Sequence, residues 1–155
     1  MKIIQFVFGL IVIFSPAVTA QKNHIVIENA HVRYCVSAQG KNISFINRAS
    51  GVDYLKHDTP SACALVKCNN EEYSATSVFF LNGLLTIDFS EVNVRAVLRV
   101  ESRDSYIRIA VESLSGDDIE SLVFLNIPLT LHGRPDESFG SCALSLNLIT
   151  RVNQL

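Results

Sequence analysis

Apolar and polar residues alternate with a period of two along most of the chain after residue 20, and this alternation limits the fold more than any other feature. It is clearest in LLTIDFS (84–90), VNVRAVLRVES (92–102) and YIRIAVES (106–113). Successive side chains of a strand point to opposite faces, so these runs predict strands with one buried and one solvated face. The turn sequence SRDS between the second and third runs predicts a hairpin.

Two segments in the first third of the chain show the same signals. Val32, Tyr34 and Val36 share one face of a predicted strand, which places Cys35 on the polar face. The following stretch, GKNISFINRASGVDYL (40–55), is predicted to be a short strand between two turns. Its first turn is assigned to Gly40 and Asn42, and Gly51 in the second turn is predicted to have positive φ.

Two later segments are strongly apolar. IESLVFLNIPLTL (119–131) is apolar on both faces, which is typical of a central strand covered on both sides, and Pro128 predicts a bulge or a strand end. CALSLNLITRV (142–152) alternates again, with Cys142 predicted to face the core. The chain stops at Leu155 soon after this strand. Either Leu155 completes an edge strand, or the chain is the front part of a larger protein, which is the interpretation we favour.

About nine strand candidates are separated by turn signals every ~8–12 residues, and no stretch shows a helical apolar stripe. The sequence therefore predicts an all-β, antiparallel β-sandwich formed by one domain, residues 21–155.

Residues 1–20 form a separate segment. Lys2 precedes the apolar run Ile3–Phe14, and Val18 and Ala20 occupy the small-residue positions before a cleavage site. This pattern predicts a helical, cleavable signal peptide, a secreted or periplasmic protein, and no stable membrane insertion after cleavage. Loss of Lys2 leaves 12 basic residues against 15 acidic ones, a formal charge of −3 with no basic stripe, so nucleic acid is not an expected partner.

The four cysteines, Cys35, Cys63, Cys68 and Cys142, all lie beyond the signal peptide. An even number of cysteines in an exported chain permits two disulfides with three connectivities, and the sequence leaves the pairing open. Some of the four could equally be small buried apolar side chains. No C-x-x-C motif or histidine pair with zinc spacing is present, so neither a metal nor a cofactor is expected.

No catalytic motif is recognisable in the sequence. His57 lies beside Asp58 and near Cys63, but a loop histidine next to a turn explains this arrangement more simply. The chain lacks Trp, the usual platform for sugar rings. The candidate rings for carbohydrate contact are Tyr54, Tyr73 and Tyr106, each of which could instead be a half-buried strand residue with a solvated hydroxyl.

The stretch GKNISFINRASGVDYL, the hairpin VRAVLRVESRDSYIRIAVESL, the apolar LVFLNIPLTL and the closing LSLNLITRVNQL together resemble a known family. They are similar to the strands of galactose-mutarotase-like β-supersandwich domains, the non-catalytic N-terminal modules of exported glycoside hydrolases. The resemblance covers most of residues 21–155 but only the front part of a supersandwich. In that family, catalysis belongs to a following barrel domain, so the resemblance assigns no catalytic residue to this chain.

These observations predict an exported, non-catalytic β-sandwich module from the N-terminal part of a polysaccharide-acting protein. The module would support a downstream catalytic domain or contact carbohydrate. A small independent secreted β-sandwich that binds a protein or surface partner is the alternative. An exported enzyme that uses His57 or scattered carboxylates is a third interpretation.

Overall fold

The computed structural model describes residues 24–152, in which all regular secondary structure is β and no helix occurs. The predicted signal peptide, residues 1–20, lies outside the described residues. Within those residues there is accordingly no helix that could span a membrane. The strands are β1 (His24–Glu28), β2 (Val32–Ser37), β3 (Asn42–Asn47), β4 (Leu65–Cys68), β5 (Glu71–Ser74), β6 (Ser77–Leu81), β7 (Leu84–Phe89), β8 (Val94–Ser102), β9 (Ile107–Ser115) and β10 (Ile119–Val123).

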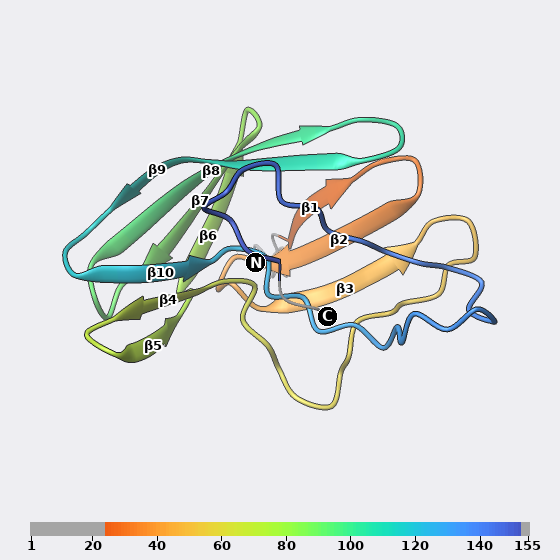
Figure 1. The fold of residues 1–155 in the computed structure, drawn as a ribbon, viewed down its shortest axis with the longest axis horizontal. Helices are drawn as coiled ribbons and strands as arrows, with labels where there is room; N and C mark the ends of the chain where they lie inside the picture. The colour runs from red at the N-terminus through yellow and green to blue at the C-terminus, as the bar shows by residue number, and fades with distance from the viewer. Residues whose placement is uncertain (1–23, 153–155) are drawn as a thin grey trace, which may run out of the picture.

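The strands form three antiparallel sheets, which Figure 1 shows from the front. Their strand orders are β1-β2-β3, β10-β4-β5 and β6-β7-β8-β9. Most neighbours are joined by short turns, whereas β10 crosses over to pair with β4 from a distant part of the chain. The prediction of an all-β, antiparallel, sandwich-like fold is therefore confirmed.

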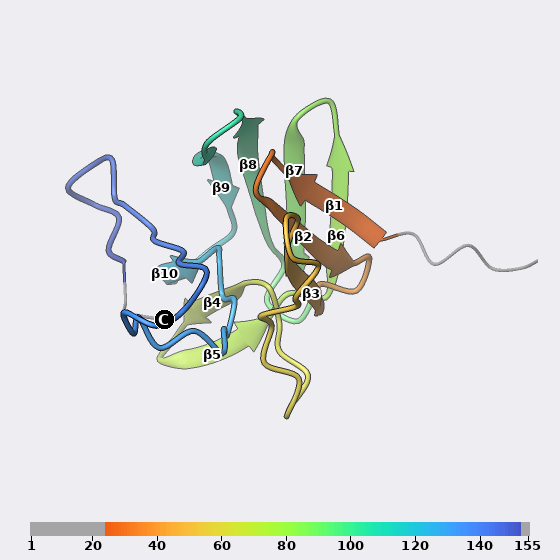
Figure 2. The ribbon, with the colours of Figure 1, turned by 90° about the vertical axis from the view of Figure 1, so that its right-hand side faces the viewer.

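One apolar core joins the three sheets, and Figure 2 shows β1–β3 lying against the four-stranded sheet. Strands β7 and β8 bury every second side chain, as their alternation predicts. The largest side chains that are almost fully buried are Phe89, Ile87, Leu98, Val36 and Val66, contributed by β7, β8, β2 and β4. Burial of this apolar surface is the main force that holds the sheets together.

The predicted hairpin is β8–β9, and it contains a β-bulge. Val97 pairs with Ser113, whereas the next residue of β8 pairs with Val111, so Glu112 is an extra residue in β9. The Glu112 carboxylate accepts a hydrogen bond from Arg99 Nε on the outer face. Val111 was predicted to be buried but is 45% exposed, because β9 is the edge of its sheet.

Two predictions near the N-terminus are wrong in detail. Cys35 was predicted to lie on a polar face but is only 8% exposed. The pairing of β2 with β3 shifts register between Cys35 and Val36, which interrupts the regular alternation, and three consecutive residues of β2 are buried there. Asn42 was assigned to a turn but begins β3 and is buried. Gly40 (φ +72°) and Gly51 (φ +74°) do occupy left-handed turn positions, which confirms the prediction for Gly51.

The apolar segment 119–131 is not a central strand. Only β10 is regular, and it lies at the edge of its sheet, with Val123 40% exposed. The chain then leaves the sheet because Asn126 binds the backbone at Ala62 and Cys63 instead of continuing a ladder. Beyond it, Pro128 lies next to an isolated bridge between Leu55 and Leu129 rather than in a strand.

The predicted strand 142–152 is also absent. This segment extends away from the sheets as an irregular loop (Figure 2), and Asn147 Oδ1 accepts hydrogen bonds from the N–H groups of residues 149 and 150. Cys142, predicted to face the core, is exposed. The side chains predicted to share its buried face, which we call the C-terminal leucines, are Leu144, Leu146 and Leu148, with exposed fractions of 80%, 76% and 103%. No described strand lies beside the segment to accept its backbone hydrogen bonds.

A buried polar network joins β2, β3 and two loops. The Tyr34 hydroxyl donates to Asn42 Oδ1. Asn42 Nδ2 in turn donates to Ser61 Oγ at 2.7 Å and to the Asn126 carbonyl oxygen at 2.8 Å. Among the described residues, no buried side-chain nitrogen or oxygen lacks a hydrogen-bond partner. The network therefore holds segments 84 positions apart together without leaving a buried polar group unsatisfied.

Candidate functional site

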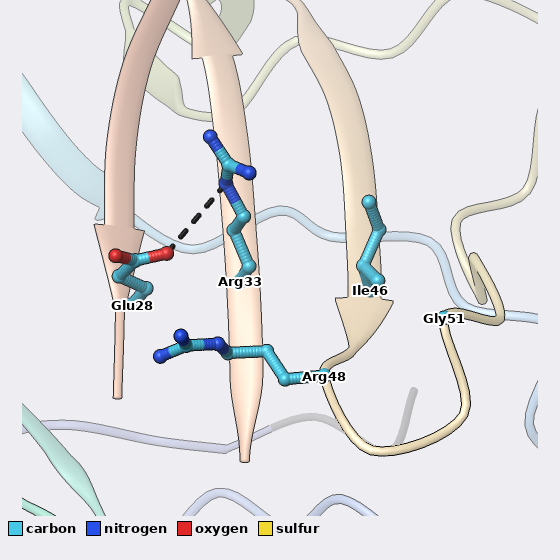
Figure 3. Close-up of a pocket in the computed structure, with 5 residues that line it drawn as sticks. All are labelled: Glu28, Arg33, Ile46, Arg48 and Gly51. Atoms are coloured by element: carbon cyan, nitrogen blue, oxygen red, sulfur yellow. Dashed lines mark ion pairs between the residues drawn. The ribbon is translucent and has the colours of Figure 1, made fainter. Parts of the chain in front are cut away.

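A shallow depression of about 360 Å³ opens at the end of the β1-β2-β3 sheet, and Figure 3 shows the residues that line it. Strand register builds its floor, because Glu28 of β1 pairs with Arg33 of β2, and Arg33 pairs with Ile46 of β3. Paired residues on adjacent antiparallel strands lie on the same face of the sheet. Arg48 and Gly51, from the turn after β3, complete the lining.

The Arg48 side chain reaches across β2 towards β1 (Figure 3) and is held there by the backbone. Its Nη1 donates to the Asn29 carbonyl oxygen at 2.5 Å, and its backbone N–H donates to the His31 carbonyl oxygen at 2.8 Å. The Asn29 side chain fixes this turn, since its Oδ1 accepts hydrogen bonds from the N–H groups of His31 and Val32 at 2.8 Å each. The position of the Arg48 guanidinium is therefore set by the β1–β2 turn.

Arg33 and Glu28 form a loose ion pair. The distance from Arg33 Nε to Glu28 Oε2 is 3.6 Å, which exceeds hydrogen-bond length, and the two side chains are 51% and 45% exposed. An exposed pair of this kind contributes at most about 1 kcal/mol to stability. The Arg33 head group is therefore available to other acceptors.

The three tyrosines predicted to contact carbohydrate lie in separate parts of the fold. Tyr54 stacks on Phe139 with ring centroids 5.2 Å apart, so one face of its ring is occupied. The Tyr73 hydroxyl, on β5, donates to Glu71 Oε2 at 2.8 Å, and this bond raises the pKa of the tyrosine. Tyr106 is 56% exposed in the β8–β9 turn. These rings do not form a common platform.

All four cysteines are free thiols in the structure, so the predicted disulfides stay a prediction for the oxidised protein. Cys35, Cys63 and Cys68 are buried. Burial raises the pKa of the Cys63 thiol from 9.0 to about 11. A thiol with this pKa carries almost no thiolate at neutral pH and is a poor nucleophile.

His57 is paired with a carboxylate, but not with the neighbouring Asp58. Its Nε2 lies 3.2 Å from Asp53 Oδ2, while Asp53 Oδ1 accepts the N–H groups of Phe45 and Leu55 at 2.9 Å each. The His57 side chain is 61% exposed. Cys63, the cysteine nearest to His57 in the sequence, is buried and un-ionised at neutral pH, so it does not supply an activated thiol. The arrangement fixes a loop rather than activating a nucleophile.

A second, wider depression of about 610 Å³ lies where the β7–β8 turn meets the end of β9. Two of its charged side chains, Asp88 and Arg95, are paired with each other. Asp88 accepts hydrogen bonds from Arg95 Nε at 2.6 Å and from Ser77 Oγ at 3.1 Å, and the bond from Arg95 lowers the pKa of the Asp88 carboxyl. This depression has fewer free donors for a ligand than the one around Arg33 and Arg48.

The outer face of β6 and β7 carries an apolar stripe that the sequence did not predict. Phe79 and Leu81 of β6 are 60% and 56% exposed, and Leu81 pairs with Leu84 of β7. We define the outer stripe as Phe79, Leu81 and Leu84. Phe79 lies in an apolar run of the sequence, but it is exposed because it points to the opposite face of β6 from buried Val78.

Residues 24–152 contain no group of three metal-binding side chains that could hold an ion. No protein-family model matches the chain, and no curated protein or solved structure is significantly similar to it. The resemblance to galactose-mutarotase-like domains stays a prediction.

Proposed function

We propose that the protein is an exported, non-catalytic β-sandwich module from the N-terminal part of a polysaccharide-acting protein, and that the depression at the end of β1-β2-β3 contacts carbohydrate. The observation that carries the proposal is the composition of this depression. Its floor includes the aliphatic side chain of Ile46, and its rim carries two guanidinium groups and one carboxylate. The lining is mostly charged, and placed charged groups fix the orientation of a bound ligand, while Ile46 offers it a small apolar surface.

The geometry also supports a binding role over a catalytic one. Catalysis needs a nucleophile or general base within hydrogen-bond reach of an orienting partner. The one carboxylate–histidine pair described above involves Asp53 and His57, which lie on an exposed loop without an activated nucleophile. Any glycosidase activity would therefore belong to a separate catalytic domain.

A glycan array probed with the exported protein tests the proposal. We expect binding to at least one saccharide, and loss of that binding in the Arg33→Ala/Arg48→Ala variant. The matched control is Arg108→Ala, since Arg108 forms a similar exposed pair with Glu101 at 3.7 Å and is 53% exposed, but lies in the β8–β9 hairpin. An array without any bound saccharide would refute the carbohydrate-contact role.

The outer stripe favours a second candidate function, an independent module that binds a protein or surface partner. Exposed apolar patches on soluble proteins mark interaction sites more often than chance would give. In this case Phe79→Ser/Leu81→Ser would abolish partner binding and leave any saccharide binding intact. Sedimentation velocity tests this second function on the exported protein and on the Phe79→Ser/Leu81→Ser variant, each mixed with the other exported proteins of the host. If both proteins sediment as monomers, the result counts against binding of a protein partner.

A further inference from the structure

We propose that Arg33 and Arg48 bind the carboxylate of an acidic sugar residue, an inference that rests on the proposed carbohydrate contact and specifies its ligand class. The two guanidinium groups come from β2 and from the turn after β3. Figure 3 shows the Arg33 side chain running along β2 and the Arg48 side chain crossing β2 towards β1. A guanidinium presents a planar fork of N–H donors that matches the two oxygens of a carboxylate.

Free hydrogen-bond donors support this assignment. Each guanidinium has five N–H groups. Within residues 24–152, the Arg48 side chain donates one hydrogen bond, to the Asn29 carbonyl oxygen, and the Arg33 side chain donates none. Most of the ten donors are therefore available to a ligand. The bond to Asn29 also reduces the conformational entropy that Arg48 would lose on binding.

The charge of the depression favours an anion, even though the exported chain carries a formal charge of −3. Two guanidinium groups face one carboxylate, that of Glu28, which leaves a local excess of one positive charge. Because Arg33 lies 3.6 Å from Glu28 without a hydrogen bond, a ligand carboxylate can form a shorter bond to Arg33 than Glu28 does. Glu28 also repels a second anionic group, so the site suits one carboxylate per sugar rather than a dense polyanion.

The remaining lining suits the C–H face of a sugar ring. Ile46 is half-buried and presents its side chain beside Arg33 on the same sheet face. At Gly51, a Cβ atom would meet no heavy atom within 4 Å, so this side of the depression is open. A volume of about 360 Å³ is at the lower end of the range for ligand sites, which favours one ring over a long buried segment.

Oligogalacturonate and its fully methyl-esterified form provide the test, because they share a backbone and differ in charge. Titration calorimetry of the exported protein should show at least tenfold tighter binding of the free acid, and weaker binding as salt rises from about 25 to about 300 mM. Arg33→Ala and Arg48→Ala should each weaken binding about tenfold, Arg33→Lys less, and the control Arg108→Ala not at all. Glu28→Gln should tighten it. Circular dichroism of each variant checks that these exposed substitutions leave the fold intact.

The outcomes separate this inference from the function on which it rests. Equal binding of the acid and its methyl ester, or an equal loss in Arg108→Ala, overturns the carboxylate site but leaves carbohydrate contact in place. Tighter binding of a sulfated oligosaccharide than of the carboxylated one assigns the site to sulfate esters and likewise overturns the inference. Failure of every saccharide on the array overturns the proposed contact as well.

Discussion

Replacing Asn42 by Ala should be among the most destabilising single substitutions of a polar residue in this protein. The side chain is 9% exposed and bonds to Tyr34, Ser61 and Asn126. Truncation leaves the Tyr34 hydroxyl, in a residue 5% exposed, without its acceptor, and it removes the Asn42 donor from the half-buried Asn126 carbonyl. A buried polar group without a partner costs about 1–3 kcal/mol. Because water can reach the second group, we expect a total loss of about 2–4 kcal/mol in the free energy of unfolding.

A double-mutant cycle isolates the Tyr34–Asn42 bond. Tyr34→Phe alone should cost about 1–2 kcal/mol, since it leaves Asn42 Oδ1 without a donor. Once Asn42 is Ala, however, the same change should cost about 1 kcal/mol less, because the hydroxyl has already lost its acceptor. The matched control is Tyr106→Phe. Because Tyr106 is 56% exposed, removal of its hydroxyl should change the free energy of unfolding by less than about 0.5 kcal/mol.

Urea unfolding followed by far-UV circular dichroism measures all four proteins of the cycle, and the slope with denaturant should stay constant. A loss below about 0.5 kcal/mol for Asn42→Ala would refute the reasoning. Additivity of the two substitutions within about 0.3 kcal/mol would do the same, since it would mean that the bond makes no net contribution to folding.

Three further outcomes follow from the structure. The folded pKa of Cys63 is about 11, against 9.0 for an exposed thiol, so the unfolded chain loses its proton first. The free energy of unfolding should therefore fall by about 2–3 kcal/mol between about pH 9 and pH 11, and urea titrations of reduced protein should show a smaller fall for Cys63→Ala. Gly40→Ala should lower the melting temperature more than Gly51→Ala. Both glycines have positive φ, but only a Cβ at Gly40 would meet another atom closely, at 2.8 Å from Ala75 Cβ. Equal effects of the two substitutions on the melting temperature would contradict the steric argument. Replacing the C-terminal leucines by Ser should change stability by less than about 0.5 kcal/mol and reduce self-association in sedimentation velocity, whereas a large drop in stability would show that they are buried.

Alternation predicts a strand well only where a partner strand is adjacent. Strands β7, β8 and β9 follow one another through short turns, so the pattern of Leu85, Ile87 and Phe89 was enough to predict both their strand and its buried face. The C-terminal leucines have an equally clear pattern but no neighbouring strand within the described residues, and they are exposed. A period of two shows which side chains share a face, but backbone hydrogen bonds to a neighbour decide whether a strand forms.

The candidate site was harder to predict because it depends on register. Arg33 and Ile46 belong to two predicted strand regions and Glu28 to none, and only the pairing of β1 with β2 and of β2 with β3 brings the three residues into one row. Asn29 provided a usable signal, since an Asn between two strand patterns indicates a turn that fixes residues 28 and 33 opposite each other. The position of Arg48 over that row depends on a bond to a backbone carbonyl, for which the sequence carries no signal.

The buried position of Asn42 has a consequence for production of the protein. Asn42, Ile43 and Ser44 form an acceptor sequence for N-linked glycosylation, which would attach a sugar to Asn42 Nδ2. That nitrogen already donates hydrogen bonds inside the fold, at a residue with no room for a glycan. Glycosylation before folding would therefore prevent this network from forming. In a host that glycosylates exported chains, Ser44→Ala would remove the acceptor sequence and leave the Asn42 amide free to form its buried hydrogen bonds.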